Sequence, residues 1–321
     1  MLDTIKTGET ERLTELARLV QATGYHFVTP TPASHARVFA RNNAEWALDL
    51  RDVFGWSRPF RGGVVPLSIV DAMRDAAVLV PHEDGWRSLV RISDLQGMQF
   101  LHSAYPTIAP DSVFFGPDTY RFASAIRHWL DCPHAAVRRA VDIGSGAGPA
   151  AALVARECPV AEVFAADIND AALALTRANA ALNGVAVTAV HSNLLDAIAG
   201  QFDLIVANPP YLVDPAERAY RHGGGPLGAS LSLRILDTAI ERLAPGGTLL
   251  LYTGAAIVSG RDPFRDAAAS RLADSGLVWR YDEVDPDVFG EELESGVYAV
   301  ADRIAAVVLT VQYRNDGHAR R

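Results

Sequence analysis

Several residue types are scarce in this 321-residue chain, and each scarcity narrows what the protein can be. Its two cysteines, Cys132 and Cys158, stand alone without CxxC spacing, so neither a disulfide framework nor a metal site is expected. Lysine occurs once, at Lys6, a bias typical of genome composition rather than of a binding surface. No apolar run reaches the length of a membrane-spanning helix, and the N-terminus lacks the basic region followed by an apolar core that is typical of a signal peptide. We therefore expect a cytoplasmic protein with reduced thiols and without a membrane partner.

The charge balance is acidic, with a formal net charge of −9. Hydrophobic residues make up 49% and charged residues 21%, proportions that indicate a globular rather than a disordered chain. A surplus of carboxylates argues against a broad nucleic-acid-binding surface, although a local basic groove is compatible with it.

A glycine-rich turn in the middle of the chain has the form of a nucleotide-binding corner. Residues 138–143 predict a short buried strand, and Gly144, Gly146 and Gly148 follow, none with a Cβ to obstruct a ligand. Pro149 then suits the first turn of a helix, where its missing N–H would be unpaired in any case. Strand, turn and helix N-terminus together predict a site for a nucleotide.

The spacing of the glycines disfavours a dinucleotide. In the dinucleotide fingerprint the third glycine stands three places after the second, and here that place is taken by Pro149. A nicotinamide-dependent oxidoreductase is therefore disfavoured. From residue 138 onward, predicted strands and helices alternate, which indicates a mainly parallel sheet with helices on both faces.

An acidic residue ends the second predicted strand of this sheet. Asp167 lies past Gly148 at close to the spacing that puts a carboxylate against ribose hydroxyls, with Ile168 beside the base. An isolated aspartate at this place would more often cap the helix that begins near residue 170. Its register with the glycine turn favours the ribose role.

A second motif, Asn208-Pro209-Pro210-Tyr211, follows directly on an apolar strand over residues 204–207. Two prolines cannot extend a central strand, so they fix the backbone at the strand's carboxyl end, where ligands sit in open α/β sheets. An amide or aromatic amine nitrogen is a poor nucleophile because its lone pair is delocalised. The Asn208 side-chain oxygen and the Pro209 carbonyl can accept its N–H bonds and orient that lone pair, while Tyr211 can stack on the planar group.

Together the two motifs resemble those of class I S-adenosyl-L-methionine (SAM) methyltransferases of the Asn-Pro-Pro-Tyr type. That group includes glutamine methyltransferases of release factors and ribosomal proteins, rRNA guanine methyltransferases and adenine-N6 enzymes. The resemblance implies a Rossmann-like α/β fold, SAM as the cofactor and catalytic roles for Asn208, Pro209, Pro210 and Tyr211. The cofactor-binding residues that it implies are Asp142, Gly144, Ser145, Gly146, Gly148, Asp167, Ile168, Asn193, Leu194 and Asn208. Asn193 departs from the family, which often has an acidic residue there for the adenine amino group.

Two domains are expected, over residues 1–108 and 109–321. The first is predicted to be a smaller α+β unit, with helices over residues 1–25, 38–51 and 67–79 and then a hairpin of residues 86–92 and 98–104. Helices followed by a hairpin are compatible with a winged-helix-like domain, serving substrate recognition or acting as a lid or dimerisation element.

The segment that joins the two domains is expected to line the mouth of the cofactor site, with Phe115, Asp118, Thr119 and Tyr120 as candidates. Arg218 and Arg221, beyond the second motif, could meet a phosphate or a carboxylate. The acidic residues 282–294 are expected to form a solvated loop and the tail, residues 315–321, to be disordered.

The function expected from these observations is SAM-dependent N-methylation of a planar amide or an exocyclic amine, in a protein glutamine or an RNA base. Two alternatives stay open: an N-methyltransferase that acts on a small-molecule amine, and a catalytically silent SAM-binding module.

Overall fold

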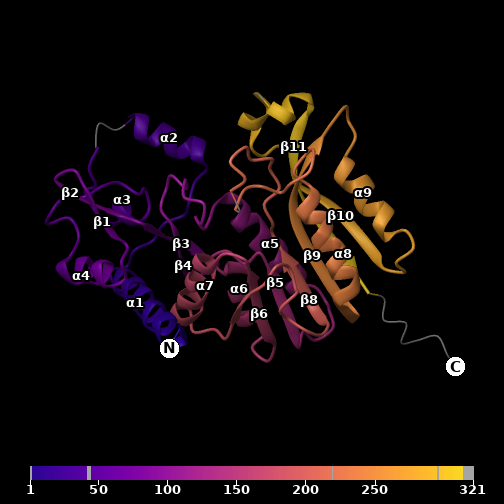
Figure 1. Ribbon diagram of the computed structural model, residues 1–321, viewed down its shortest axis with the longest axis horizontal. Coiled ribbons are helices and arrows are strands. Elements are labelled where there is room, and N and C mark those ends of the chain that lie inside the picture. Colours follow the sequence, from indigo (N-terminus) through magenta and orange to yellow (C-terminus); the bar gives the residue numbers. More distant parts are fainter. Residues whose placement is uncertain (1, 42–44, 219, 295, 314–321) are drawn as a thin grey trace.

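The computed structural model describes residues 2–41, 45–218, 220–294 and 296–313 (Figure 1). The tail predicted to be disordered lies outside these residues. Across the described ranges, no helix combines the length and the apolar character needed to cross a membrane.

A seven-stranded sheet with the order β10-β11-β9-β8-β5-β6-β7 forms the centre of the protein. Its strands are β5 (Arg139–Ile143), β6 (Glu162–Asp167), β7 (Thr188–His191), β8 (Phe202–Ala207), β9 (Leu243–Ile257), β10 (Val278–Asp285) and β11 (Arg303–Gln312). The five strands β5 to β9 are parallel, whereas β11 runs antiparallel to both β9 and β10. The expectation of a Rossmann-like, mainly parallel α/β sheet is confirmed.

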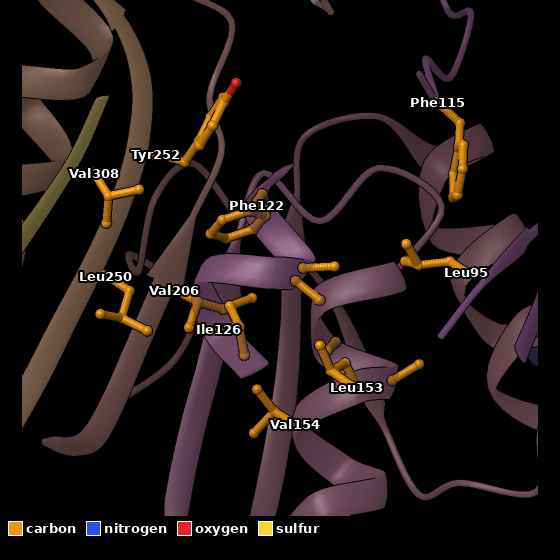
Figure 2. Close-up of a cluster of buried hydrophobic side chains, with 14 of the residues drawn as sticks. Leu95, Phe115, Phe122, Ile126, Leu153, Val154, Val206, Leu250, Tyr252 and Val308 are labelled. Carbon is orange, nitrogen blue, oxygen red and sulfur yellow. The ribbon is translucent and has the colours of Figure 1, made fainter. Parts of the chain in front are cut away.

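Helices cover both faces of the sheet because successive side chains of each buried strand point to opposite sides. Leu204 and Val206 belong to the apolar cluster that contains α5 (Pro117–Asp131) and α6 (Pro149–Glu157), and Ile205 to the cluster of α8 and α9. Figure 2 shows the first cluster, in which Ile126 of α5 lies beside Val206. The remaining helices are α7 (Asp170–Leu182), α8 (Ser230–Arg242) and α9 (Pro263–Leu272). The parallel strands are thereby enclosed on both faces.

The N-terminal part of the chain consists of short helices and two hairpins (Figure 1). Its elements are α1 (Leu2–Ala22), α2 (Pro32–Arg41), α3 (Leu50–Phe54), α4 (Leu67–Asp75), β1 (Leu79–His82), β2 (Gly85–Ser88), β3 (Val90–Leu95) and β4 (Met98–Ser103). They share an apolar core with α7, to which Leu16 of α1 and Leu175 of α7 both belong. The Asn179 side chain of α7 also accepts from the Leu101 N–H at 2.8 Å and donates to the Leu101 carbonyl at 2.9 Å. The edge of β4 is thus bonded to the large domain.

Two of the N-terminal predictions are wrong. The helix expected over residues 38–51 is instead α2, which begins at Pro32, and the separate short helix α3. Residues 45–49 are not helical, and the Asp49 side chain caps α3 by accepting from Asp52 N. The strand expected over residues 86–92 is interrupted because the Ser88 hydroxyl donates to the Val90 carbonyl and accepts from the Val90 N–H, which ends β2 and starts β3. The winged-helix-like description and the division at residue 108 stay predictions.

Candidate active site

The glycine turn connects β5 to α6 and lies at the carboxyl end of the parallel strands. Gly144, Gly146 and Gly148 have φ values of 73°, 55° and 78°, in the left-handed region that favours glycine. A Cβ on Gly148 would also lie 2.9 Å from the Thr176 side chain, whereas one on Gly144 would meet nothing within 4 Å. The turn therefore leaves open space beside Gly144 where a ligand can approach the backbone.

Asp142 is buried beneath this turn, and its carboxylate accepts from Ala151 N in the first turn of α6 at 3.1 Å. Burial disfavours the charged carboxylate and raises the pKa of Asp142 from 3.8 to about 7, an effect that the Ala151 hydrogen bond offsets in part. Asp142 thus links the end of β5 to the start of α6, and its charge state changes near neutral pH.

This pKa gives the fold a pH dependence that can be tested. Because the folded protein keeps a proton that the unfolded chain loses near pH 4, the contribution of Asp142 to stability is fully present below pH 3.8 and is lost as the pH rises through about 7. Asp142→Asn keeps an acceptor for Ala151 but cannot ionise. Its unfolding temperature should lack this decline and should exceed that of the wild type above pH 7, both measured without ligand. Parallel curves for the two proteins between roughly pH 4 and pH 8 would contradict the assignment.

Asp167 stands at the end of β6, beside the glycine turn. Its carboxylate accepts from Gly146 N at 2.9 Å and from Asn169 N at 2.9 Å, and burial raises its pKa. The helix-cap alternative is excluded, because it is the Asn169 side chain that accepts from Ala171 N and caps α7. Ile168, which is 55% exposed, lines the same cavity. The acidic side chain of Asp167 and the apolar side chain of Ile168 are therefore neighbours, an arrangement that suits a ribose and its base respectively.

Asn193 and Leu194 follow β7 and also line this cavity. The Asn193 amide donates to the Asp196 carboxylate at 3.3 Å, which leaves its carbonyl oxygen as an acceptor. Ser192 N donates to the Asp167 carbonyl at 3.0 Å and so joins this strand end to the previous one. Contact between Asn193 and the adenine amino group stays a prediction.

Asn208, Pro209, Pro210 and Tyr211 directly follow β8, the neighbour of β5 in the sheet, and all four line the cavity. Within the described part of the chain, neither the Asn208 side chain nor the Pro209 carbonyl has a hydrogen-bond partner. Both oxygens can therefore accept hydrogen bonds from the N–H groups of a ligand that enters the cavity.

Tyr211 is held in place by groups that the sequence did not connect with it. It is 6% exposed, and its hydroxyl donates to Asp118 of α5 at 2.5 Å, while Tyr252 of β9 donates to the other oxygen at 2.8 Å. Arg121 bridges Asp118, at 3.0 Å, to Asp285, at 2.7 Å. Burial, and then the charge of Asp118, raises the pKa of Tyr211 well above its usual value, so Tyr211 stays a neutral donor. This network fixes the end of the Asn-Pro-Pro-Tyr motif; stacking of Tyr211 on an acceptor stays a prediction.

The backbone of β9 also supports Tyr211, at Gly254. A Cβ at Gly254 would lie 2.2 Å from Cδ2 and 2.3 Å from Cε2 of the Tyr211 ring. We expect Gly254→Ala to displace this ring, to lower the free energy of unfolding by about 1–3 kcal/mol and to slow the methyl transfer that the sequence predicts. Gly62→Ala is the matched control, because its Cβ meets nothing within 4 Å. Denaturant unfolding and transfer rates measure both effects, and a Gly254→Ala protein as stable and active as Gly62→Ala would refute the role of this contact.

Arg218 and Arg221, the two arginines beyond the motif, are already paired. Arg218 donates to both carboxylate oxygens of Asp214, at 2.8 and 2.6 Å, and the Arg218 hydrogen bond lowers the pKa of Asp214 to about 2. Arg221 pairs with Glu292. The expectation that residues 282–294 form only a solvated loop is wrong, because β10 extends to Asp285 and Phe289 of this segment lines the cavity. Phe289 gave no sequence signal, since it lies far along the chain from both motifs.

These strand ends open into one cavity of about 480 Å³. Phe115, Asp118 and Thr119 line it, whereas Tyr120 is not among its lining residues and its hydroxyl accepts from Thr29 N at 3.0 Å. Ser145 presents a buried hydroxyl that has no hydrogen-bond partner within the described residues. A free hydroxyl, open space at Gly144 and the Asp167 carboxylate fit a nucleoside with a polar tail. No cluster of three or more metal-ligating side chains occurs in the described ranges.

Comparison with known proteins gives a consistent result. Residues 125–257 match the Methyltransferase small domain family. The chain is 34% identical over 195 residues to the release factor glutamine methyltransferase of Bordetella pertussis, a match that covers 54% of this chain and 70% of that enzyme. Identity to the release factor glutamine methyltransferase of Deinococcus radiodurans is 38% over 167 residues, covering 48% of this chain and 55% of that enzyme.

One of the similar solved structures is the 16S rRNA N2 G1207 methyltransferase of T. thermophilus in complex with AdoMet and guanosine. Its TM-score is 0.46 at 18% identity, and the match covers 80% of this chain and 64% of that one.

Proposed function

The chain belongs to the class I SAM-dependent methyltransferases of the Asn-Pro-Pro-Tyr type, and we propose that its acceptor is the side-chain amide of a protein glutamine. The observation that carries the proposal is that Asn208 and Pro209 line the same cavity as the glycine turn, while their two oxygens have no hydrogen-bond partner among the described residues. Two acceptors match the two N–H bonds of a primary amide.

The residues proposed to hold SAM are those at the ends of β5, β6 and β7. Asp167 would accept from the ribose hydroxyls, and Ile168 and Leu194 would pack beside the adenine. The glycine turn and the Ser145 hydroxyl would meet the amino-acid part, with Asp142 holding the turn to α6. When bound, SAM supplies an electrophilic methyl group on a sulfonium.

Asn208 and Pro209 are proposed to grip the two N–H bonds of the acceptor amide. That contact turns the nitrogen lone pair toward the glycine turn and favours a more tetrahedral nitrogen. Neither group titrates near neutral pH, so the rate depends on placement and electrostatics rather than on a general base. Pro210 and the Tyr211–Asp118 hydrogen bond keep these two oxygens in position.

A protein acceptor is preferred to RNA on the grounds of charge. The formal net charge is −9, and the arginines nearest the motif, Arg218 and Arg221, already pair with Asp214 and Glu292. A polyanionic backbone would have to displace those carboxylates. Curated relatives named for release factors support the same preference, and acceptors from the translation machinery would place the enzyme in the cytoplasm.

Labelling of a cell extract tests this proposal. The full chain is incubated with tritiated SAM and extract, and aliquots are digested with protease or with RNase. We expect protease alone to release the label from the macromolecular fraction. Release by RNase would make an RNA base the acceptor, and label resistant to both would point to a small-molecule amine. A protein that binds SAM but labels nothing would be the silent module.

A further inference from the structure

Arg91 lines the same cavity as Asn208 and, among the described residues, is a buried cation without a counter-ion. It is 4% exposed, and its Nε and Nη2 atoms have no hydrogen-bond partner within the described residues. None of the ion pairs of those residues includes Arg91; its guanidinium lies over the Phe27 ring, 5.4 Å from the ring centre. Leaving such donors buried and unpaired is costly, so the arrangement calls for a ligand.

The β3–β4 hairpin directs Arg91 into the cavity. Arg91 lies opposite His102 in the ladder, and both side chains line the cavity, whereas Ile92 and Leu101, on the other face, belong to the core shared with α1. The alternation of the two strands thus places Arg91 and His102 on the face of the hairpin opposite Ile92 and Leu101. The cavity is continuous from Arg91 to Asn208.

The polar side chains on the same face as Arg91 form hydrogen bonds with one another, and none of their partners among the described residues is Arg91. The Ser93 hydroxyl contacts Thr29 Oγ1 at 2.6 Å and His102 Nε2 at 2.9 Å. Burial, followed by the nearby charge of Arg91, lowers the pKa of His102 well below its usual value. Burial also lowers the pKa of His35 to about 4, so both histidines are neutral at pH 7.

Arg91 itself stays charged, because its pKa falls only to about 10 on burial. The groups that counteract this lowering of the Arg91 pKa are the tyrosines Tyr25, Tyr120 and Tyr105, and no carboxylate is among them. Among the described residues, Arg91 therefore brings one uncompensated positive charge to the cavity.

We propose that Arg91 binds a carboxylate of the methyl acceptor, so that the substrate is an acidic peptide segment with its glutamine amide held at Asn208. The proposal rests on the proposed function of the Asn208 end. A planar guanidinium matches a carboxylate through two parallel N–H bonds. A single buried cation balances one such group, whereas an RNA strand would bring one phosphate per nucleotide to a cavity whose other arginines, Arg218 and Arg221, are paired.

Thermal unfolding of the full chain tests this carboxylate subsite without knowledge of the substrate. The probes are sodium acetate, sodium phosphate and sodium chloride at matched pH and ionic strength. Acetate should raise the unfolding temperature of the wild type in a saturable manner relative to chloride, and phosphate should not. Arg91→Met should abolish the acetate response and should unfold at or above the wild-type temperature without acetate, because it removes an unpaired buried charge.

Arg58→Met is the matched control. Arg58 is equally buried but pairs with Asp52 at 3.8 Å, so its replacement should lower the unfolding temperature and leave the acetate response intact. Arg91→Lys keeps the charge without the planar fork and should weaken the response, which covers the case in which Arg91→Met does not fold.

An acetate response that is absent from the wild type, or equal in the Arg91 variants, would overturn the proposal. A response to phosphate alone would also overturn it and would make the ligand a phosphate. Calorimetry of the wild type with SAM separates the two hypotheses: without SAM binding the proposed function fails, while the acetate result still decides the role of Arg91.

Discussion

Replacing Asn208 with alanine is expected to slow methyl transfer by about 100- to 1000-fold, the effect of removing one fixed polar group from a site of developing charge. The side-chain oxygen of Asn208 is proposed to grip the acceptor N–H, and alanine leaves that bond unmade at the moment of transfer. Because the glycine turn and Asp167 are untouched, SAM affinity should change little. Single-turnover experiments with the labelled extract fraction measure the rate of methyl transfer, and calorimetry measures the affinity for SAM.

Asn183→Ala is the matched control for Asn208→Ala. Asn183 is also an asparagine beside a backbone segment, but its amide donates to the Gln99 carbonyl at 2.8 Å, at the edge of β4 and away from the cavity. Its loss should lower the unfolding temperature and leave the rate per folded molecule unchanged. If Asn208→Ala transfers methyl groups as fast as Asn183→Ala, the role of Asn208 in gripping the acceptor nitrogen is wrong.

The second large effect is expected at Asp167, where alanine should weaken SAM binding by about 10- to 100-fold. Hydrogen bonds to a charged acceptor contribute about 1.5–3 kcal/mol, and the carboxylate also positions Gly146 N, to which it is bonded at 2.9 Å. Asp167→Asn retains one acceptor oxygen and should fall between alanine and the wild type. Calorimetric titration with SAM measures all three proteins.

Asp237→Ala serves as the control for this series, since Asp237 is exposed on α8 and pairs only with Arg271 among the described residues. It should bind SAM as the wild type does. Equal SAM affinity for the Asp167 and Asp237 variants would remove Asp167 from the cofactor site.

The site residues that could be predicted from the sequence are those whose positions depend only on the order of the parallel strands. The glycine turn and Asn208 directly follow strands, Asp167 is the last residue of a strand, and β6, β5 and β8 are neighbours in the sheet. Because the carboxyl ends of parallel strands meet at one edge, an alternating α/β pattern is enough to bring these residues together. Predicting that these residues lie close together therefore needs no knowledge of contacts between residues far apart in the sequence.

The groups that support this edge could not be predicted in the same way. Asp118 precedes Tyr211 by a long stretch of chain, and the bond between them depends on how α5 crosses the sheet. Arg91 was missed for a different reason: its strand has buried residues on both faces, so alternation alone does not reveal which face meets a cavity. The break at Ser88 depends on a local side-chain hydrogen bond that no hydrophobic pattern reports.

The central claim is that the Asn208 end of the cavity directs a methyl group from SAM to a planar nitrogen, and the chemical position of the transferred methyl tests it most directly. After labelling with tritiated SAM, the purified product is hydrolysed in acid and the tritium is identified. An N-methylated glutamine releases labelled methylamine, which is the predicted result. Labelled methanol, which an O-methyl ester would release, or label retained on carbon or sulfur, would contradict the account.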